Sequence, residues 1–347
     1  MIFNLKQIIS LLLLPLFFSP LFAQQEEEPL YKDFVSKFQT KSFSIGFLSQ
    51  NIADFQSTRI SGKSGFTVPN LRLKLTGEFD DGIGYHIQTN FISTPTILFG
   101  FGYWKIDPSF NIEFGLMKTP FGREYYLVAA QNTDFIYRSQ VINALSMRRQ
   151  IGAHVKGVVI DNHFSYGFGI YNGNSFSDKG NDNNDFMVSS RVAFLTSLSE
   201  NKKDKFEIGL SAASSYDSTR IKVQKNYFPD PVKKLYYGAD LKLVYSDFLL
   251  TGEFIGIDMK ANSGVKANPT GLYLTLGYML NAKMQGLIKW DNLRSMKLTS
   301  ISDSDQLIFG YTYWVTTPFK VQVNYVVPFP QKDLKFHQLL INAQIAI

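Results

Sequence analysis

The residues best suited to chemistry are basic side chains in and beside one long segment, residues 119–148. Positive charges outnumber Glu124 and Asp134 there. These cations are Lys118, Arg123, Arg138, Arg148 and Arg149. Arginine keeps its charge at physiological pH and presents a planar fork that suits phosphate or carboxylate groups. The excess predicts a region that attracts anions, and the alternative is a basic loop facing solvent or lipopolysaccharide.

The same segment is also rich in apolar side chains, which a solvated loop has little reason to contain. They are Phe121, Tyr125, Tyr126, Leu127, Val128, Phe135 and Ile136. Burial against the inside of a wall explains them, so we predict that the segment folds inward. A surface loop packed on its neighbours is the alternative.

The wall that would hold this segment is indicated by a period-2 pattern. Leu71, Leu73 and Leu75 alternate with Arg72 and Lys74, which places the apolar residues on one face of a strand and the charged residues on the other. About sixteen such segments recur, starting near 41, 66, 83, 96, 109, 149, 162, 185, 204, 234, 248, 270, 283, 304, 318 and 335.

Connections between these strands alternate between short and long. Short ones lie near 80–82, 107–108, 161–162, 246–247, 281–282 and 316–318, and long ones near 52–65, 119–148, 172–184, 217–233, 259–268 and 292–303. Two connections break the rule, a short outer one near 93–96 and a longer inner one at 197–204. This segregation is typical of an up-and-down barrel across a membrane, with tight turns on one side and variable loops on the other.

The fold class predicted is therefore all-β: a transmembrane antiparallel up-and-down β-barrel of about 16 strands, with a long inward-folded third loop. A soluble lipocalin-like barrel is excluded because its apolar side faces inward and its chain is about half this length. Strict alternation from Leu339 to Ile347 predicts a last strand that closes the barrel on the first, since an unpaired edge in lipid is costly.

The start of the chain predicts export. Lys6 precedes an apolar run that ends before Ala23, which is the pattern of a cleaved signal peptide, residues 1–23. The alternative, a membrane anchor, is disfavoured because the run is short and contains Pro15 and Pro20. Residues 24–40 are then a short periplasmic segment and residues 41–347 the barrel. The absence of cysteine excludes a lipoprotein and a disulfide-stapled domain.

Other functional classes find less support in the sequence. The net charge of +6 could suit nucleic acid, but export makes that partner implausible. His86, His154, His163 and His337 fall in separate strands without a nucleophile motif, so we expect no enzyme, no cofactor and no metal site. The polar run 178–185 could bind a divalent cation, but its spacing matches no EF-hand loop.

Four stretches resemble the phosphate-selective porin O and P family. They are 72–79, 115–124, 149–152 and 166–173, and the Lys-x-Pro-Phe-Gly-x-Glu element at 118–124 is the most specific. The resemblance implies a trimeric, sixteen-stranded channel with a basic constriction. Its arginine ladder and lysine cluster cannot be placed residue by residue, and only Lys118 and Arg123 lie within the matching motif.

We therefore expect a porin of the Gram-negative outer membrane, a homotrimer that passes small solutes and favours anions such as phosphate. The constriction residues predicted are Lys118, Arg123, Arg138, Arg148, Arg149, Arg72 and Lys74. Lipid and lipopolysaccharide would surround the barrel. Alternatives are a receptor, an adhesin, a specific uptake channel for an organic solute, or an outer-membrane hydrolase.

Overall fold

The computed structural model describes residues 29–56, 64–93, 96–173, 180–181, 183–200, 203–217, 222–223, 226–227, 231–294, 303–329 and 333–347. The expected signal peptide, 1–23, lies outside these ranges, as do parts of the predicted outer loops and of the polar run 178–185. None of the helices described is both long and apolar enough to cross a membrane.

Sixteen long strands form one closed antiparallel sheet within the described residues, as predicted. They are β1 (Ser44–Gln56), β2 (Gly65–Glu78), β3 (Ile83–Asn90), β4 (Ile97–Asp107), β5 (Phe110–Lys118), β6 (Arg149–Val159), β7 (Phe164–Tyr171), β8 (Met187–Ser197), β9 (Lys205–Asp217), β12 (Val232–Tyr245), β13 (Phe248–Ala261), β15 (Thr270–Asn281), β16 (Met284–Arg294), β17 (Ser304–Thr316), β18 (Phe319–Phe329) and β19 (Gln338–Ala346). The predicted starts are confirmed to within three residues.

Closure of the barrel occurs where the sequence predicted it. β1 pairs with β19 from Leu48 opposite Ala346 to Gln56 opposite Gln338, and every other long strand pairs with its neighbours along the chain. The backbone of Ile347 exchanges two further hydrogen bonds with Phe47. Within the described ranges, each long strand of the barrel is therefore paired on both sides, and an unpaired edge in lipid is avoided.

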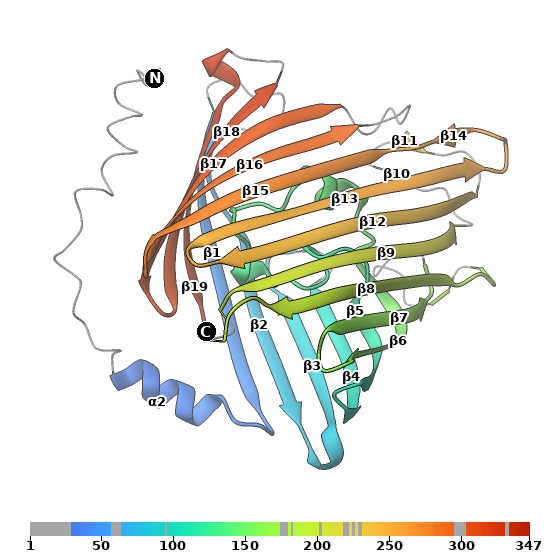
Figure 1. Cartoon of the computed structure of the whole chain (residues 1–347), viewed down its shortest axis with the longest axis horizontal. Coiled ribbons are helices and arrows are strands. Elements are labelled where there is room, and N and C mark those ends of the chain that lie inside the picture. The colour runs from blue at the N-terminus through green and yellow to red at the C-terminus, as the bar shows by residue number, and fades with distance from the viewer. Residues whose placement is uncertain are drawn as a thin grey trace.

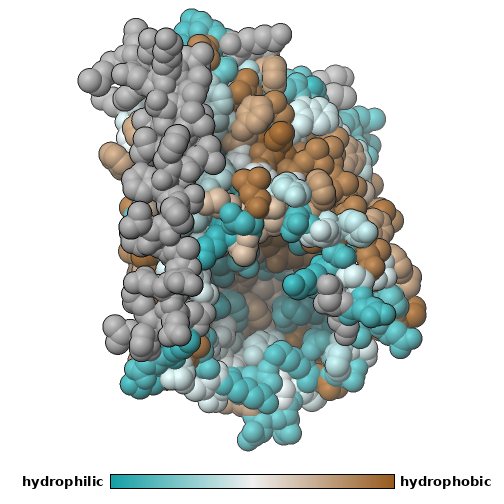
Figure 2. Space-filling model, turned by 60° about the vertical axis from the view of Figure 1, so that its left-hand side comes forward, coloured by the Kyte–Doolittle hydropathy of each residue, from teal (hydrophilic) through white to brown (hydrophobic). Residues whose placement is uncertain are grey.

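Side chains alternate across the wall. On β5, Phe114 is 58% exposed on the outside, whereas its neighbour Glu113 is 9% exposed on the inside. Figure 2 shows the consequence: the molecule is hollowed, hydrophilic residues gather around the hollow, and hydrophobic residues cover the flank beside it.

The tight turns lie together at one end of the barrel. Backbone bonds join neighbouring turns, for example Val158 to Pro108 and Trp314 to Lys283. Positive φ angles at Asp81 and Ser246 allow these reversals in two or three residues. The longer connection after Ser197, which the sequence marked as an exception, belongs to the same end, because Ser246 donates its amide to the Asp204 carboxylate at 2.7 Å.

Smaller elements complete the chain. They are α2 (Pro29–Phe38), η1 (Asp80–Gly82), η2 (Ala130–Asn132), α3 (Gln140–Leu145), η3 (Leu334–Phe336), and the two-residue strands β10 (Lys222–Val223), β11 (Asn226–Tyr227) and β14 (Lys266–Ala267). The sequence predicted none of these helices; α2 falls in the expected periplasmic segment. Figure 1 shows the chain between β5 and β6, in green, inside the barrel, which confirms the inward-folded third loop.

Candidate functional site

The loop between β5 and β6, residues 119–148, is held inside the barrel by an apolar core. Phe121, Val141, Ile142 and Leu145 are at most 2% exposed. They pack on inward-facing residues of β12, β13 and β15, among them Tyr236, Ile255 and Tyr273. Phe135 and Ile136 enter a second core on the inner faces of β1 and of β16 to β19. The apolar content of the loop is thus explained by burial against the wall.

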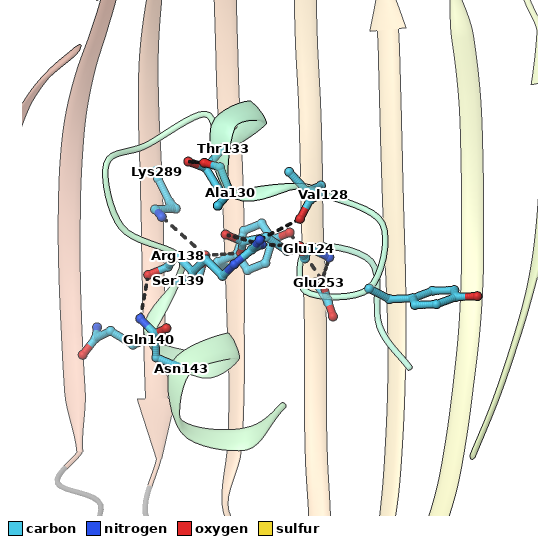
Figure 3. A network of polar contacts seen from close by, with 12 residues as sticks. Glu124, Val128, Ala130, Thr133, Arg138, Ser139, Gln140, Asn143, Glu253 and Lys289 are labelled. Atoms are coloured by element: carbon cyan, nitrogen blue, oxygen red, sulfur yellow. Dashed lines mark hydrogen bonds and ion pairs between the residues drawn. The ribbon is translucent and has the colours of Figure 1, made fainter. Parts of the chain in front are cut away.

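Polar contacts fix the loop at mid-height of the strands. The Glu124 amide donates to Glu253 on β13, and the Ile136 amide donates to Asn324 on β18, both at 2.8 Å. Asp291 on β16 accepts the amide of Gln140, the first residue of α3, at 2.8 Å. Figure 3 shows two places where the loop meets the wall, with Glu124 beside Glu253 and Ser139 beside Lys289.

Gly122 brings the loop backbone into close contact with the wall. Its φ is +66°, and its amide donates to the Ser211 hydroxyl at 3.0 Å. A Cβ atom at this position would lie 2.1 Å from Oε1 of Glu253. Only glycine combines this left-handed backbone with so small a separation.

Acidic residues on this side of the barrel are largely neutralised by partners. Arg191 on β8 forms ion pairs with Asp240 on β12 at 2.6 Å and with Glu207 on β9 at 2.8 Å. All three side chains are largely buried. Arg123, itself 9% exposed, points its Nε at Glu207 from 3.4 Å. Its charge is therefore satisfied within the loop–wall interface.

A small cavity of about 20 Å³ lies in this interface, lined by Arg123, Asp134 and Lys289 among others. Burial raises the pKa of the Asp134 carboxyl, and the negative charge of Glu124 raises it further. The interface therefore favours the neutral, protonated form of Asp134.

Cations gather instead on the other side of the loop, around the ring of Tyr125. Lys118, Arg138 and Arg149 lie 5.4, 5.5 and 5.8 Å from the ring centroid. Arg149 also donates to the Tyr125 hydroxyl at 3.1 Å. Arg72, on β2, lies close enough to interact electrostatically with Lys118, Arg138 and Arg149. We call these four residues, Arg72, Lys118, Arg138 and Arg149, the basic cluster.

Loop carbonyl groups hold two members of the basic cluster in place. Lys118 donates to the carbonyl oxygens of Tyr126 and Val128 at 3.4 and 3.1 Å. Arg138 donates to the carbonyl of Glu124 and, at 2.6 Å, to that of Val128. Carbonyl oxygens carry no net charge, so these contacts do not themselves offset the charge of either residue. The Glu124 carboxylate, 4.0 Å from Nη1 of Arg138, offsets that of Arg138 in part.

The remaining predicted residues lie at the margins. Lys74 faces inward on β2 and interacts electrostatically with His86 on β3. Arg148 is exposed at the end of the loop and donates to the Asn143 carbonyl at 3.0 Å. The structure thus brings four of the seven predicted residues together and separates Arg123 from them.

Some functional residues were missed by reasoning from sequence. Glu253 and Asp291 were not singled out from the sequence, and Tyr125 was identified only as an apolar member of the loop. Nothing in the sequence near either carboxylate indicates that it anchors a loop from distant residues.

Comparison with known proteins agrees with this geometry. A family model described as phosphate-selective porin O and P matches residues 48–293. The chain belongs to the phosphate-selective porin O and P family. This confirms the resemblance that the motif at 118–124 indicated, and with it an outer-membrane porin. No curated protein matches the porin.

Solved structures similar to the porin share its fold. The anion-selective porin from Comamonas acidovorans is 12% identical, with a TM-score of 0.66, over 88% of this chain and 99% of that chain. OmpT of Vibrio cholerae, in a trimer form, is 10% identical with a TM-score of 0.62 over 88% and 99%. OmpF of Salmonella typhi, in complex with daunomycin, is 12% identical with a TM-score of 0.59 over 88% and 97%.

Proposed function

We propose that this porin is a passive, anion-preferring channel whose narrowest part lies beside the basic cluster. The observation that carries the proposal is the convergence of Arg72, Lys118, Arg138 and Arg149 around Tyr125. The loop packs mainly on the inner faces of β7 to β9, β12, β13 and β15 to β19, and its cores also include Ile52 of β1 and Phe101 of β4. We infer that the open lumen lies beside β2 and β3. Cations that line a narrow, partly dehydrated passage favour anions.

Phosphate is the solute that the family's description suggests, and the planar guanidinium groups of Arg72, Arg138 and Arg149 suit it. Of the seven residues predicted, Arg123 and Arg148 contribute least to selectivity, since one is ion-paired and the other lies at the margin. Transport needs no catalytic step, so the purified porin should show neither lipase nor protease activity in detergent.

A charge reversal in the basic cluster tests the proposal. Arg72→Glu is preferable to changes at Arg123 and Arg138, because those two residues also hold the loop together. In planar bilayers across a KCl gradient, the unmodified porin should give the reversal potential of an anion-selective channel. Arg72→Glu should lower the chloride-to-potassium permeability ratio at least about twofold, because it removes one positive charge and adds a negative one at close range.

Lys283→Glu is the matched control. It makes the same charge change in the exposed turn between β15 and β16, away from the loop. Its permeability ratio should stay at the unmodified value. A cation-selective unmodified channel, or equal ratios for Arg72→Glu and Lys283→Glu, would refute the proposed constriction.

Export and assembly form the remaining part of the proposal. Cleavage after Ala23 releases a mature chain that begins near Gln24, and three copies assemble in the outer membrane with lipid and lipopolysaccharide around them. The signal pattern at 1–23 supports the first step, and the trimer form of the similar OmpT structure supports the second.

A further inference from the structure

Aromatic rings line the wall next to the basic cluster, on β3 and β4. His86 stacks on Phe101 with centroids 5.0 Å apart and planes at 17°. Phe99 lies 5.0 Å from His86 and 6.1 Å from Phe101. We call these three residues, His86, Phe99 and Phe101, the aromatic wall.

The aromatic wall belongs to the inside of the barrel. His86 pairs directly with Phe101, and Phe101 pairs with Gly115, in the row of residues that face the lumen. All three rings are only half-buried, so each retains surface that the loop and its neighbours leave uncovered. Inorganic ions gain little from such surface, because it offers no hydrogen bond to replace their hydration.

Positive charge borders the aromatic wall. The Arg149 guanidinium lies 4.6 Å from the centroid of the Phe99 ring and bonds Tyr125 on its other side. The charges of Lys74 on β2 and Lys118 on β5 act on His86, together with the negative charge of Glu113, which is itself paired with Lys156. One solute could therefore reach cations with its charged end while its apolar part lies on the rings.

We propose that the aromatic wall and the basic cluster together form a subsite for small aromatic anions, in which Arg149 joins the two parts. The anionic group is held by guanidinium and ammonium groups, and the aromatic part stacks against Phe99 and Phe101 in an offset or edge-to-face arrangement. This inference rests on the proposed anion channel and names the class of solute that its constriction binds best.

Two probes that share one charged group separate the aromatic contribution from the ionic one. Phenylphosphonate and methylphosphonate are each added to the purified porin in planar bilayers, and block of the chloride current is measured against concentration. Phenylphosphonate should block at about tenfold lower concentration, because stacking one ring removes apolar surface from water. Equal blocking concentrations would overturn the subsite.

Variants locate the effect at the aromatic wall. Phe99→Leu keeps an apolar side chain but removes the ring, so the ratio of the two blocking concentrations should fall from about tenfold to about threefold or less. Phe101→Leu provides a second, independent test should the first variant fail to fold. Phe114→Leu is the control, because Phe114 lies on β5 but is 58% exposed on the outer face.

The aromatic subsite and the anion channel can be refuted independently of each other. A ratio that stays near tenfold in both Phe99→Leu and Phe101→Leu overturns the subsite, whatever the ion selectivity. A cation-selective reversal potential in KCl refutes the proposed function, and it can be found whether or not phenylphosphonate is the better blocker. Heat-dependent gel mobility of each variant verifies that the barrel has formed.

Discussion

Gly122→Ala should release the third loop from the wall. An alanine at φ +66° adopts a left-handed backbone at a cost of about 1–2 kcal/mol. Its Cβ would also lie 2.1 Å from Oε1 of Glu253, so that carboxylate must move. The movement breaks the 2.8 Å bond from the Glu124 amide, and a buried donor left without its acceptor costs about 1–3 kcal/mol.

Together these effects shift the balance between seated and released loop by about 3 kcal/mol, roughly a hundredfold. Single-channel recording measures the outcome, because a released loop changes the cross-section of the pore. We expect the occupancy of a second conductance level to rise about a hundredfold over the unmodified porin. Gly286→Ala is the control, since nothing lies within 4 Å of a Cβ built there.

A double-mutant cycle checks the physical cause. Glu253→Ala alone removes the anchor of the Glu124 amide and should itself release the loop. In the double variant, Glu253→Ala should add little to the occupancy produced by Gly122→Ala, because the alanine at 122 has already displaced the Glu253 carboxylate. If the two effects simply add, the Cβ clash is not the cause. If Gly122→Ala shows no second conductance level, the loop is not held against the wall in the way described.

The remaining predictions concern the loop–wall interface and the processed chain. Because burial raises the pKa of Asp134, the native state binds a proton more tightly than the unfolded chain, so stability falls as pH rises through the window above the ordinary carboxyl pKa. Asp134→Asn should therefore raise the temperature at which the folded gel band disappears at pH 7, and the gain should vanish below about pH 4. If the variant and the unmodified porin lose the folded band at the same temperature at pH 7, the prediction is wrong. Native mass spectrometry in detergent should give three copies of a chain beginning near Gln24, whereas a retained segment 1–23 would refute cleavage and a single-chain mass would refute the trimer.

Much of the fold could be predicted because its signals are local. Leu71, Leu73 and Leu75 alternate with charged residues because successive side chains of a strand point to opposite faces, and each strand carries that pattern independently of the others. The inward loop was predictable for a related reason: Phe121, Phe135 and Ile136 require burial, and the lumen side of the wall provides it.

Elements that depend on distant partners could not be predicted in this way. Helix α3 begins after Ser139, whose side chain makes no capping bond to it. Its first amide is instead satisfied by Asp291, a residue of β16. Similarly, the position of Tyr125 among three cations results from the meeting of β5, β6 and the loop, which no spacing within one segment reveals.

The selectivity proposed here depends on which charges are neutralised and not on how many the wall carries. Inward-facing acidic residues roughly balance the basic ones in number, but they serve structural roles: Glu253 and Asp291 anchor the loop, and Asp240 is bonded to Arg191. Lys118 and Arg138 are held mainly by carbonyl groups, which carry no net charge, and the nearest carboxylate to Arg138 is that of Glu124 at 4.0 Å. We propose that folding the loop against one side of the barrel in this way converts a nearly balanced wall into a passage whose field is positive where it is narrowest.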